Sequence, residues 1–116
     1  MKFQLMQITL SDAEIDQINE GVVTEKYSNR LDISCFGSKK LDAVYNALEE
    51  GYYETVAEID AKSLEDAFYI GNFMGDNPTK VKMIAESVFS VSVGDILVDE
   101  EGCRHLVDTF GFVQIL

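Results

Sequence analysis

Residues 93–116, VGDILVDEEGCRHLVDTFGFVQIL, are the stretch of this sequence that decides the fold class. A short apolar run at 96–98 is followed by Asp99-Glu100-Glu101-Gly102, a tetrapeptide typical of a hairpin turn. The pattern then predicts a return strand over 103–109 and a last short strand over 110–116. Successive strands joined by short turns at this end of the chain indicate an antiparallel sheet.

Two segments further upstream have the composition of strands. Residues 2–10 (KFQLMQITL) are rich in large apolar side chains, with a break in the alternation between Leu5 and Met6. Residues 52–60 (YYETVAEID) alternate more strictly. This alternation predicts one face formed by Tyr53, Thr55, Ala57 and Ile59 and an opposite, more solvated face formed by Glu54, Glu58 and Asp60.

Three segments carry helix signals. Ser11 and Glu14 have the spacing of a capping box, so a short helix is expected to begin there. Apolar residues within 38–50 recur at helical spacing. Ser63 is expected to cap a third helix, which frays toward Gly71 and Asn72.

Two segments leave alternatives open. Residues 22–36 (VVTEKYSNRLDISCF) favour a hairpin, with Ser28 and Asn29 at its turn. Residues 79–90 combine apolar spacing that suits a short helix with β-branched residues that favour extended chain.

These elements predict the α+β class, an antiparallel sheet with two or three short helices packed on one face. A chain of 116 residues is expected to form a single domain, residues 1–116, with a core that needs neither disulfides nor metal. Within it, residues 1–50 form a strand-helix-hairpin-helix part to which no function is assigned.

The charge is strongly unbalanced. Twenty-one acidic and nine basic side chains give a net charge of −12 and a sequence pI near 4.2. The hydrophobic content of 47% is that of a folded protein, so the excess must lie on the surface. Such a surface repels nucleic acid and anionic membranes and attracts basic partners. The alternative is that the charge only keeps the protein soluble.

The cysteines and the hydropathy bear on location. Cys35 and Cys103 lie far apart, and His105 is the only histidine, so zinc-ligand spacing is absent. No secretory signal pattern precedes the cysteines, and no apolar run is long enough to span a bilayer. We therefore expect reduced cysteines in a cytoplasmic protein.

The sequence contains no specific motif for catalysis or cofactor binding. Adjacent carboxylates such as Glu65 and Asp66 are typical of solvated turns and helix ends. Cys103 and His105 would share a face of the predicted strand, but the third group that orients a nucleophile–base pair is not indicated. Phosphate-binding glycine loops and basic, aromatic-rich patches are also absent. We expect a protein that is not an enzyme, has no cofactor or metal, and does not bind nucleic acid directly.

Residues 57–116 contain a recognisable order of motifs. SVSVGD at 90–95 is followed by the apolar strand at 96–98, the acidic turn at 99–102 and Gly111-Phe112. This order resembles a module of small proteins carried by phages, plasmids and other mobile elements, including YodL-like domains. The resemblance implies a protein that acts by binding a host protein. Some such proteins mimic the charge of DNA and block restriction or CRISPR effectors. The resemblance identifies no catalytic residue.

Charge and resemblance together lead to a hypothesis about function. We expect a small acidic protein that binds and inhibits a host protein with a basic, nucleic-acid-binding surface, as an anti-restriction or anti-CRISPR inhibitor would. The side chains expected to contact this partner are Glu49, Glu50, Glu54, Glu58, Asp60, Asp99, Glu100 and Glu101. The alternative is a structural module that self-assembles, for example as a homodimer, through a sheet edge or exposed tyrosines.

Overall fold

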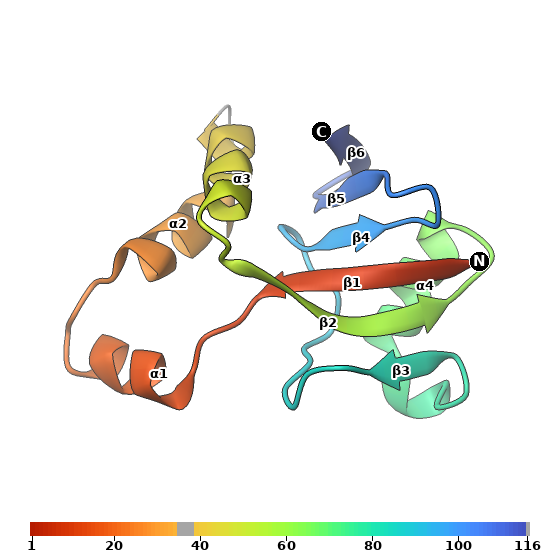
Figure 1. Ribbon diagram of the computed structural model, residues 1–116, viewed down its shortest axis with the longest axis horizontal. Helices are drawn as coiled ribbons and strands as arrows, with labels where there is room; N and C mark the ends of the chain where they lie inside the picture. Colours follow the sequence, from red (N-terminus) through yellow and green to blue (C-terminus); the bar gives the residue numbers. More distant parts are fainter. Residues whose placement is uncertain (35–38, 116) are drawn as a thin grey trace. The chain divides into compact units, whose positions relative to one another are not determined.

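In the computed structural model, which describes residues 1–34 and 39–115, a six-stranded antiparallel sheet has the order β3-β2-β1-β4-β5-β6 (Figure 1). The strands are β1 (Lys2–Ile8), β2 (Tyr53–Asp60), β3 (Val81–Met83), β4 (Ile96–Val98), β5 (Arg104–Asp108) and β6 (Gly111–Ile115). The helices are α1 (Asp12–Asn19), α2 (Glu25–Ser34), α3 (Lys39–Glu49) and α4 (Leu64–Asn72), and a single 3₁₀ turn, η1, spans Met74–Asp76. The predicted α+β class with an antiparallel sheet is confirmed.

The C-terminal strands follow the sequence prediction closely. β4, β5 and β6 form a meander in which Leu97 pairs with His105 and Val107 pairs with Phe112. On its other side, β4 pairs with β1, and Leu97 lies opposite Leu5. The predicted last strand extended to residue 116, which lies outside the described residues.

The chain divides into two compact units. The sheet unit comprises Met1–Gln7 and Thr55–Leu116, and the helical unit comprises Ile8–Glu54. The helical unit therefore interrupts the sheet unit between β1 and β2. The single domain over residues 1–116 stays a prediction.

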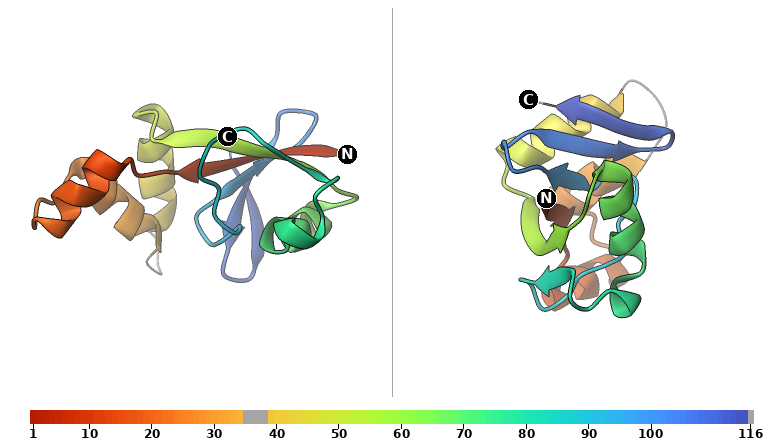
Figure 2. Two further views of the ribbon diagram at one scale, coloured as in Figure 1. Left: turned by 90° about the horizontal axis from the view of Figure 1, so that it is seen from below. Right: turned by 90° about the vertical axis from the view of Figure 1, so that its right-hand side faces the viewer.

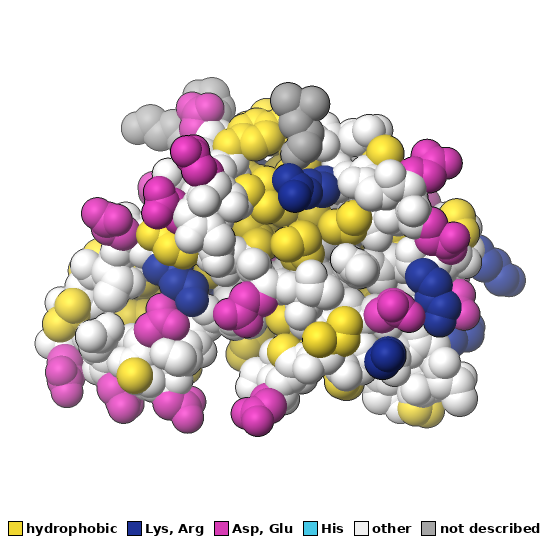
Figure 3. Space-filling view, in the orientation of Figure 1, with side chains coloured by type: hydrophobic (Ala, Val, Ile, Leu, Met, Phe, Trp, Pro, Cys, Tyr) yellow, Lys and Arg dark blue, Asp and Glu magenta, His cyan; other side chains and the backbone are white. Residues whose placement is uncertain are grey.

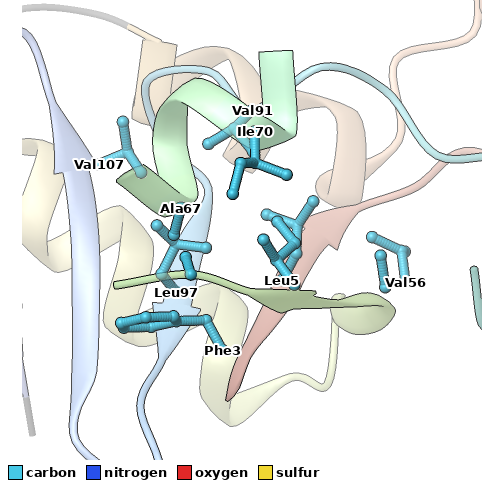
Figure 4. Close-up of a cluster of buried hydrophobic side chains, with 11 residues drawn as sticks. Phe3, Leu5, Val56, Ala67, Ile70, Val91, Leu97 and Val107 are labelled. Atoms are coloured by element: carbon cyan, nitrogen blue, oxygen red, sulfur yellow. The ribbon is translucent and has the colours of Figure 1, made fainter. Parts of the chain in front are cut away.

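The core of the sheet unit lies between α4 and one face of the sheet (Figures 2 and 4). Ala67 and Ile70 of α4 are fully buried and point toward Leu5 and Leu97 of the central strands (Figure 4). Ser63 caps α4, as predicted, because its side chain accepts a hydrogen bond from the N–H of Asp66.

Helix α4 ends at Asn72, as predicted, and Gly71 is buried against Val91, which comes from the loop before β4. Because glycine has no Cβ, the loop can approach the helix closely at this position. The role of Gly71 is therefore packing and not helix termination.

The opposite face of β2 is less solvated than predicted. Glu54 and Asp60 are exposed, but Val56 between them is completely buried. Ile96 of β4 and Leu106 of β5, which pair with each other, are buried, and so is Leu97, the next residue of β4, which faces the other side of the sheet. Burial on both faces explains the continuous apolar run Ile96–Val98, since a strand covered on both sides needs no polar alternation.

The hairpin predicted over residues 22–36 is wrong. Helix α2 occupies Glu25–Ser34, and Thr24 caps it, because the Thr24 hydroxyl accepts a hydrogen bond from the N–H of Tyr27 at 3.2 Å. Ser28 and Asn29, placed at a turn, are in the helix interior. The described residues thus contain four helices and not two or three. Residues 35 and 36 of the predicted hairpin lie outside them.

The other open segment, residues 79–90, contains a strand and no helix. β3 pairs with β2, with Val81 opposite Ile59 and Met83 opposite Ala57.

The capping box that begins α1 is confirmed. The Ser11 side chain accepts a hydrogen bond from the N–H of Glu14, and the Glu14 carboxylate accepts one from the N–H of Ser11. These hydrogen bonds matter because α1 buries no residue.

Candidate functional site

Three of the predicted partner-binding carboxylates lie together in the sheet unit. Glu58 of β2 and Asp99 and Glu100 of the β4–β5 turn line one hollow of about 470 Å³, together with Lys2 and Gln4 of β1. Antiparallel pairing of β1 with β4 brings the start of β1 to the end of β4, next to the turn. Asp60 at the end of β2 and Glu101 in the turn are exposed and do not line this hollow.

Lys2 partly neutralises the hollow. Its Nζ lies 3.3 Å from Oε1 of Glu58, and its backbone N–H donates to Oε1 of Glu100 at 2.7 Å. Sequence reasoning missed this cation because Lys2 is separated from both carboxylates by more than fifty residues. The hollow is therefore a mixed-charge surface, which attracts a basic partner less strongly than carboxylates alone would.

Asp99 organises the β4–β5 turn. Its Oδ1 accepts the N–H groups of Glu101 at 2.9 Å and Cys103 at 3.0 Å, and its Oδ2 lies 2.9 Å from Nε2 of His105. The partner of His105 is thus this carboxylate. The arrangement fixes a tight turn, and it gives Asp99 a structural task beside any contact with a partner.

The hydrogen bond from His105 has a measurable consequence for acid titration. That bond, aided by the N–H groups of Cys103 and Glu101, lowers the pKa of Asp99 below its ordinary value of 3.8. Because the folded-state pKa is depressed, the associated stability is present above the ordinary pKa and is lost as the pH falls through the lowered value. We expect His105→Phe to raise the pKa of Asp99 toward 3.8 without reaching it, since both backbone donors remain.

Carboxyl carbon NMR of the folded protein measures this pKa directly. The carboxyl carbon of Asp76, which is exposed, supplies the reference signal in the wild type and in His105→Phe. An unchanged pKa of Asp99 in the variant would show that the backbone donors alone depress it.

The remaining predicted carboxylates belong to the helical unit. Glu49 ends α3, Glu50 follows it, and both are exposed. Glu54 is exposed and accepts a hydrogen bond from the Thr9 hydroxyl at 2.9 Å. Burial raises the pKa of Tyr52, and the carboxylates of Glu50 and Glu25 raise it further. The negative potential of this unit therefore reaches a tyrosine that lies outside the helices.

A groove between α2 and α3, which the sequence did not predict, collects further carboxylates. Its volume is about 650 Å³. The residues that line it are Glu25, Ser28, Asn29, Asp32, Asp42, Ala43 and Asn46. No lysine or arginine is among them. The described lining of this "α2–α3 groove" is thus negative, whereas the lining of the hollow in the sheet unit includes the cation of Lys2.

Asn29 holds the two helices that form the groove. Its side chain is 6% exposed, donates to the carbonyl of Ala43 at 2.8 Å, and accepts from the amide of Asn46. A helical signal was present in the sequence, because polar residues 25, 28, 29 and 32 have i, i+3, i+4, i+7 spacing. That spacing was obscured by the β-branched residues before it, which favoured the hairpin.

Cys103 is a free thiol, and Cys35 lies outside the described residues. Of the neighbouring tyrosines Tyr52 and Tyr53, Tyr53 is buried and Tyr52 is half-buried. In the part of the chain that the structure describes, no three His, Cys, Asp or Glu side chains are grouped to hold a metal ion. None of the helices described is long and apolar enough to cross a membrane.

Comparison with known proteins adds no relative. No protein-family model matches the chain, and searches of curated proteins and of solved structures found no significant match. The resemblance of residues 57–116 to YodL-like modules stays a prediction.

Proposed function

We propose that this protein binds the basic, nucleic-acid-binding surface of a host protein and inhibits it by occupying that surface. The observation that carries the proposal is the α2–α3 groove, in which Glu25, Asp32 and Asp42 face one space and no basic side chain is among the described residues that line it. Carboxylates held at fixed positions on two helices present negative charge to a partner without an ordering cost for a loop.

The charge of the whole chain supports the same proposal. The helical unit carries ten acidic and four basic side chains, and the sheet unit carries eleven and five, so each has a net charge of −6. On the face shown in Figure 3, Asp and Glu side chains are spread widely, whereas Lys and Arg side chains are few. A field of one sign accelerates encounter with a basic surface and makes binding sensitive to salt.

The groove ranks above the hollow of the sheet unit as the contact surface. Glu58 and Glu100 of the hollow already interact with Lys2, so a partner would have to displace or tolerate that cation. Glu49, Glu50 and Glu54 of the helical unit, and Asp60 and Glu101 of the sheet unit, are exposed and add to the negative charge of their own units. The origin in a phage or mobile element and the location in the cytoplasm belong to the same proposal and rest on the sequence alone.

The test is capture of the partner from host lysate, followed by competition. The immobilised full chain should retain a nucleic-acid-binding protein at about 0.1 M salt and release it at about 1 M, where the Debye length falls to about 3 Å. Duplex DNA added at low salt should displace the captured protein, because both occupy the same surface. Retention that survives both treatments, or capture of the chain's own copies alone, contradicts the proposal.

Matched charge variants then locate the surface. Glu25→Gln, Asp32→Asn and Asp42→Asn together remove three charges from the groove. Asp16→Asn, Asp76→Asn and Glu86→Gln together remove three exposed charges elsewhere. We expect the groove variant to weaken binding about 3- to 100-fold, since exposed ion pairs contribute about 0.2–1 kcal/mol each. Equal weakening in both variants would assign the effect to net charge and not to the groove.

A further inference from the structure

A pocket of about 220 Å³ lies in the sheet unit, between the start of α4 and the β5–β6 hairpin. Its walls are Phe68 of α4, Val107 of β5 and Phe112 of β6, and Glu65 and Asp108 also line it. We call it the hairpin pocket. Figure 2 shows α4 beside the strands that form the hairpin.

The size of the hairpin pocket restricts what can enter. Its volume is below the range of about 300–1,000 Å³ usual for small-molecule and cofactor sites. It is well above the space of about 30 Å³ that one water molecule occupies. The pocket therefore fits one long side chain of a partner protein.

The chemistry of the walls selects the type of side chain. The ring centroids of Phe68 and Phe112 are 6.3 Å apart, and the ring planes are inclined at 77°. The two rings therefore form an edge-to-face pair in the wall of the pocket. Aromatic faces attract a cation, and the apolar wall of Val107 accepts the methylene stem that carries it.

The charge of the lining points the same way. Glu65 is exposed in the first turn of α4, and Asp108 is at the end of β5, with one oxygen accepting the Thr109 N–H at 2.8 Å. The described residues that line the pocket include no basic side chain. Apolar walls with carboxylates beside them complement a side chain that has an apolar stem and a cationic head.

We propose that the hairpin pocket binds the guanidinium side chain of an arginine in the basic partner. Arginine fits better than lysine because its planar, weakly hydrated head stacks on aromatic rings and pairs with carboxylates at once. Phe110, at the tip of the hairpin and 98% exposed, provides apolar surface beside the pocket for the residues that flank the arginine. The inference rests on the proposed function and names one side chain that the partner must present.

An NMR titration of the full chain tests the inference without the partner. The probe is a blocked Gly-Arg-Gly tripeptide, and the control ligand replaces arginine with citrulline, which has the same shape without the charge. We expect saturable shifts of the Phe68 and Phe112 ring signals with a Kd of about 1 mM or weaker, because one side chain supplies little binding energy. Citrulline should bind at least about tenfold more weakly.

Variants with matched controls assign the shifts to the pocket. Phe68→Leu should weaken binding about 5- to 10-fold and Glu65→Gln about 2- to 5-fold. The controls are Phe73→Leu, an exposed phenylalanine just after the same helix, and Glu86→Gln, an exposed carboxylate of the same unit. Both controls should leave the affinity unchanged.

Four results would overturn the inference. They are no saturable shift up to about 50 mM tripeptide, equal binding of citrulline, shifts confined to the α2–α3 groove, and no weakening by Phe68→Leu. The proposed function is tested by a different measurement, namely whether salt and duplex DNA release the captured partner. A partner captured equally well by Phe68→Leu and by the wild type would remove the pocket and leave the proposed function standing.

Discussion

Replacing Gly71 with alanine is expected to destabilise the fold by about 1–3 kcal/mol, because the added methyl group overpacks the core of the sheet unit. A Cβ at this position would overlap with Cγ2 of Val91 and would lie 3.4 Å from Cδ1 of Ile59. Alanine favours a helix more than glycine does by roughly 1 kcal/mol, so a net loss of stability would be due to packing alone. Urea denaturation monitored by circular dichroism measures the change.

A double-mutant cycle with Val91→Ala isolates that contact. Val91→Ala alone should cost about 1–3 kcal/mol, because it deletes two buried methyl groups. The same deletion removes the atom that the methyl group at position 71 would meet. We therefore expect the double variant to be more stable than the sum of the two single changes predicts, by about 1 kcal/mol or more. Additive effects would show that helix and loop separate freely and that Gly71 is not a packing constraint.

Gln7→Glu is expected to destabilise the fold by about 2–3 kcal/mol at neutral pH, because a buried hydrogen-bond donor becomes a carboxylate oxygen. Gln7 is 3% exposed. Its amide nitrogen donates to the Phe89 carbonyl at 2.8 Å and to Oδ2 of Asp95 at 3.0 Å. Its amide oxygen accepts the Phe89 N–H at 3.2 Å. Glutamate keeps the shape and the acceptor but places a negative oxygen against the Asp95 carboxylate and the Phe89 carbonyl.

The pH dependence of this variant distinguishes charge from shape. Burial next to Asp95 raises the folded-state pKa of the introduced carboxyl above its unfolded value. The variant therefore has its full stability below the unfolded pKa and loses stability as the pH rises through the folded pKa. Gln17→Glu, the same change at an exposed position of α1, is the control and should alter stability by less than about 0.5 kcal/mol. Equal destabilisation of Gln7→Glu at acid and neutral pH would contradict the electrostatic reason.

The candidate surfaces were predictable only in part. The acidic character of Glu58, Asp99 and Glu100 followed from the sequence, and the structure places all three along one hollow. The salt bridge and hydrogen bond from Lys2 were not predictable, because they depend on the pairing of strands distant in sequence. The α2–α3 groove was missed for a different reason. The strand propensity of residues 22–24 outweighed the helical spacing of the polar residues 25, 28, 29 and 32, and polar residues alone do not indicate which face of a segment is buried.

The sequence by itself determined the features that depend on near neighbours. The β4–β5 turn at 99–102, the strands on either side of it, and the caps at Ser11 and Ser63 all follow from interactions across a few residues.

Only the tertiary structure decided the features that depend on distant partners. Asn29 holds helix α2 against α3 through a hydrogen bond to the Ala43 carbonyl. Gly71 packs against Val91, and Gln7 forms hydrogen bonds with Phe89, 82 residues away. A polar residue in a core strand or a glycine inside a helix is locally unfavourable. Each is stable here because a specific group from elsewhere in the chain satisfies it, and a local pattern carries no information about that group.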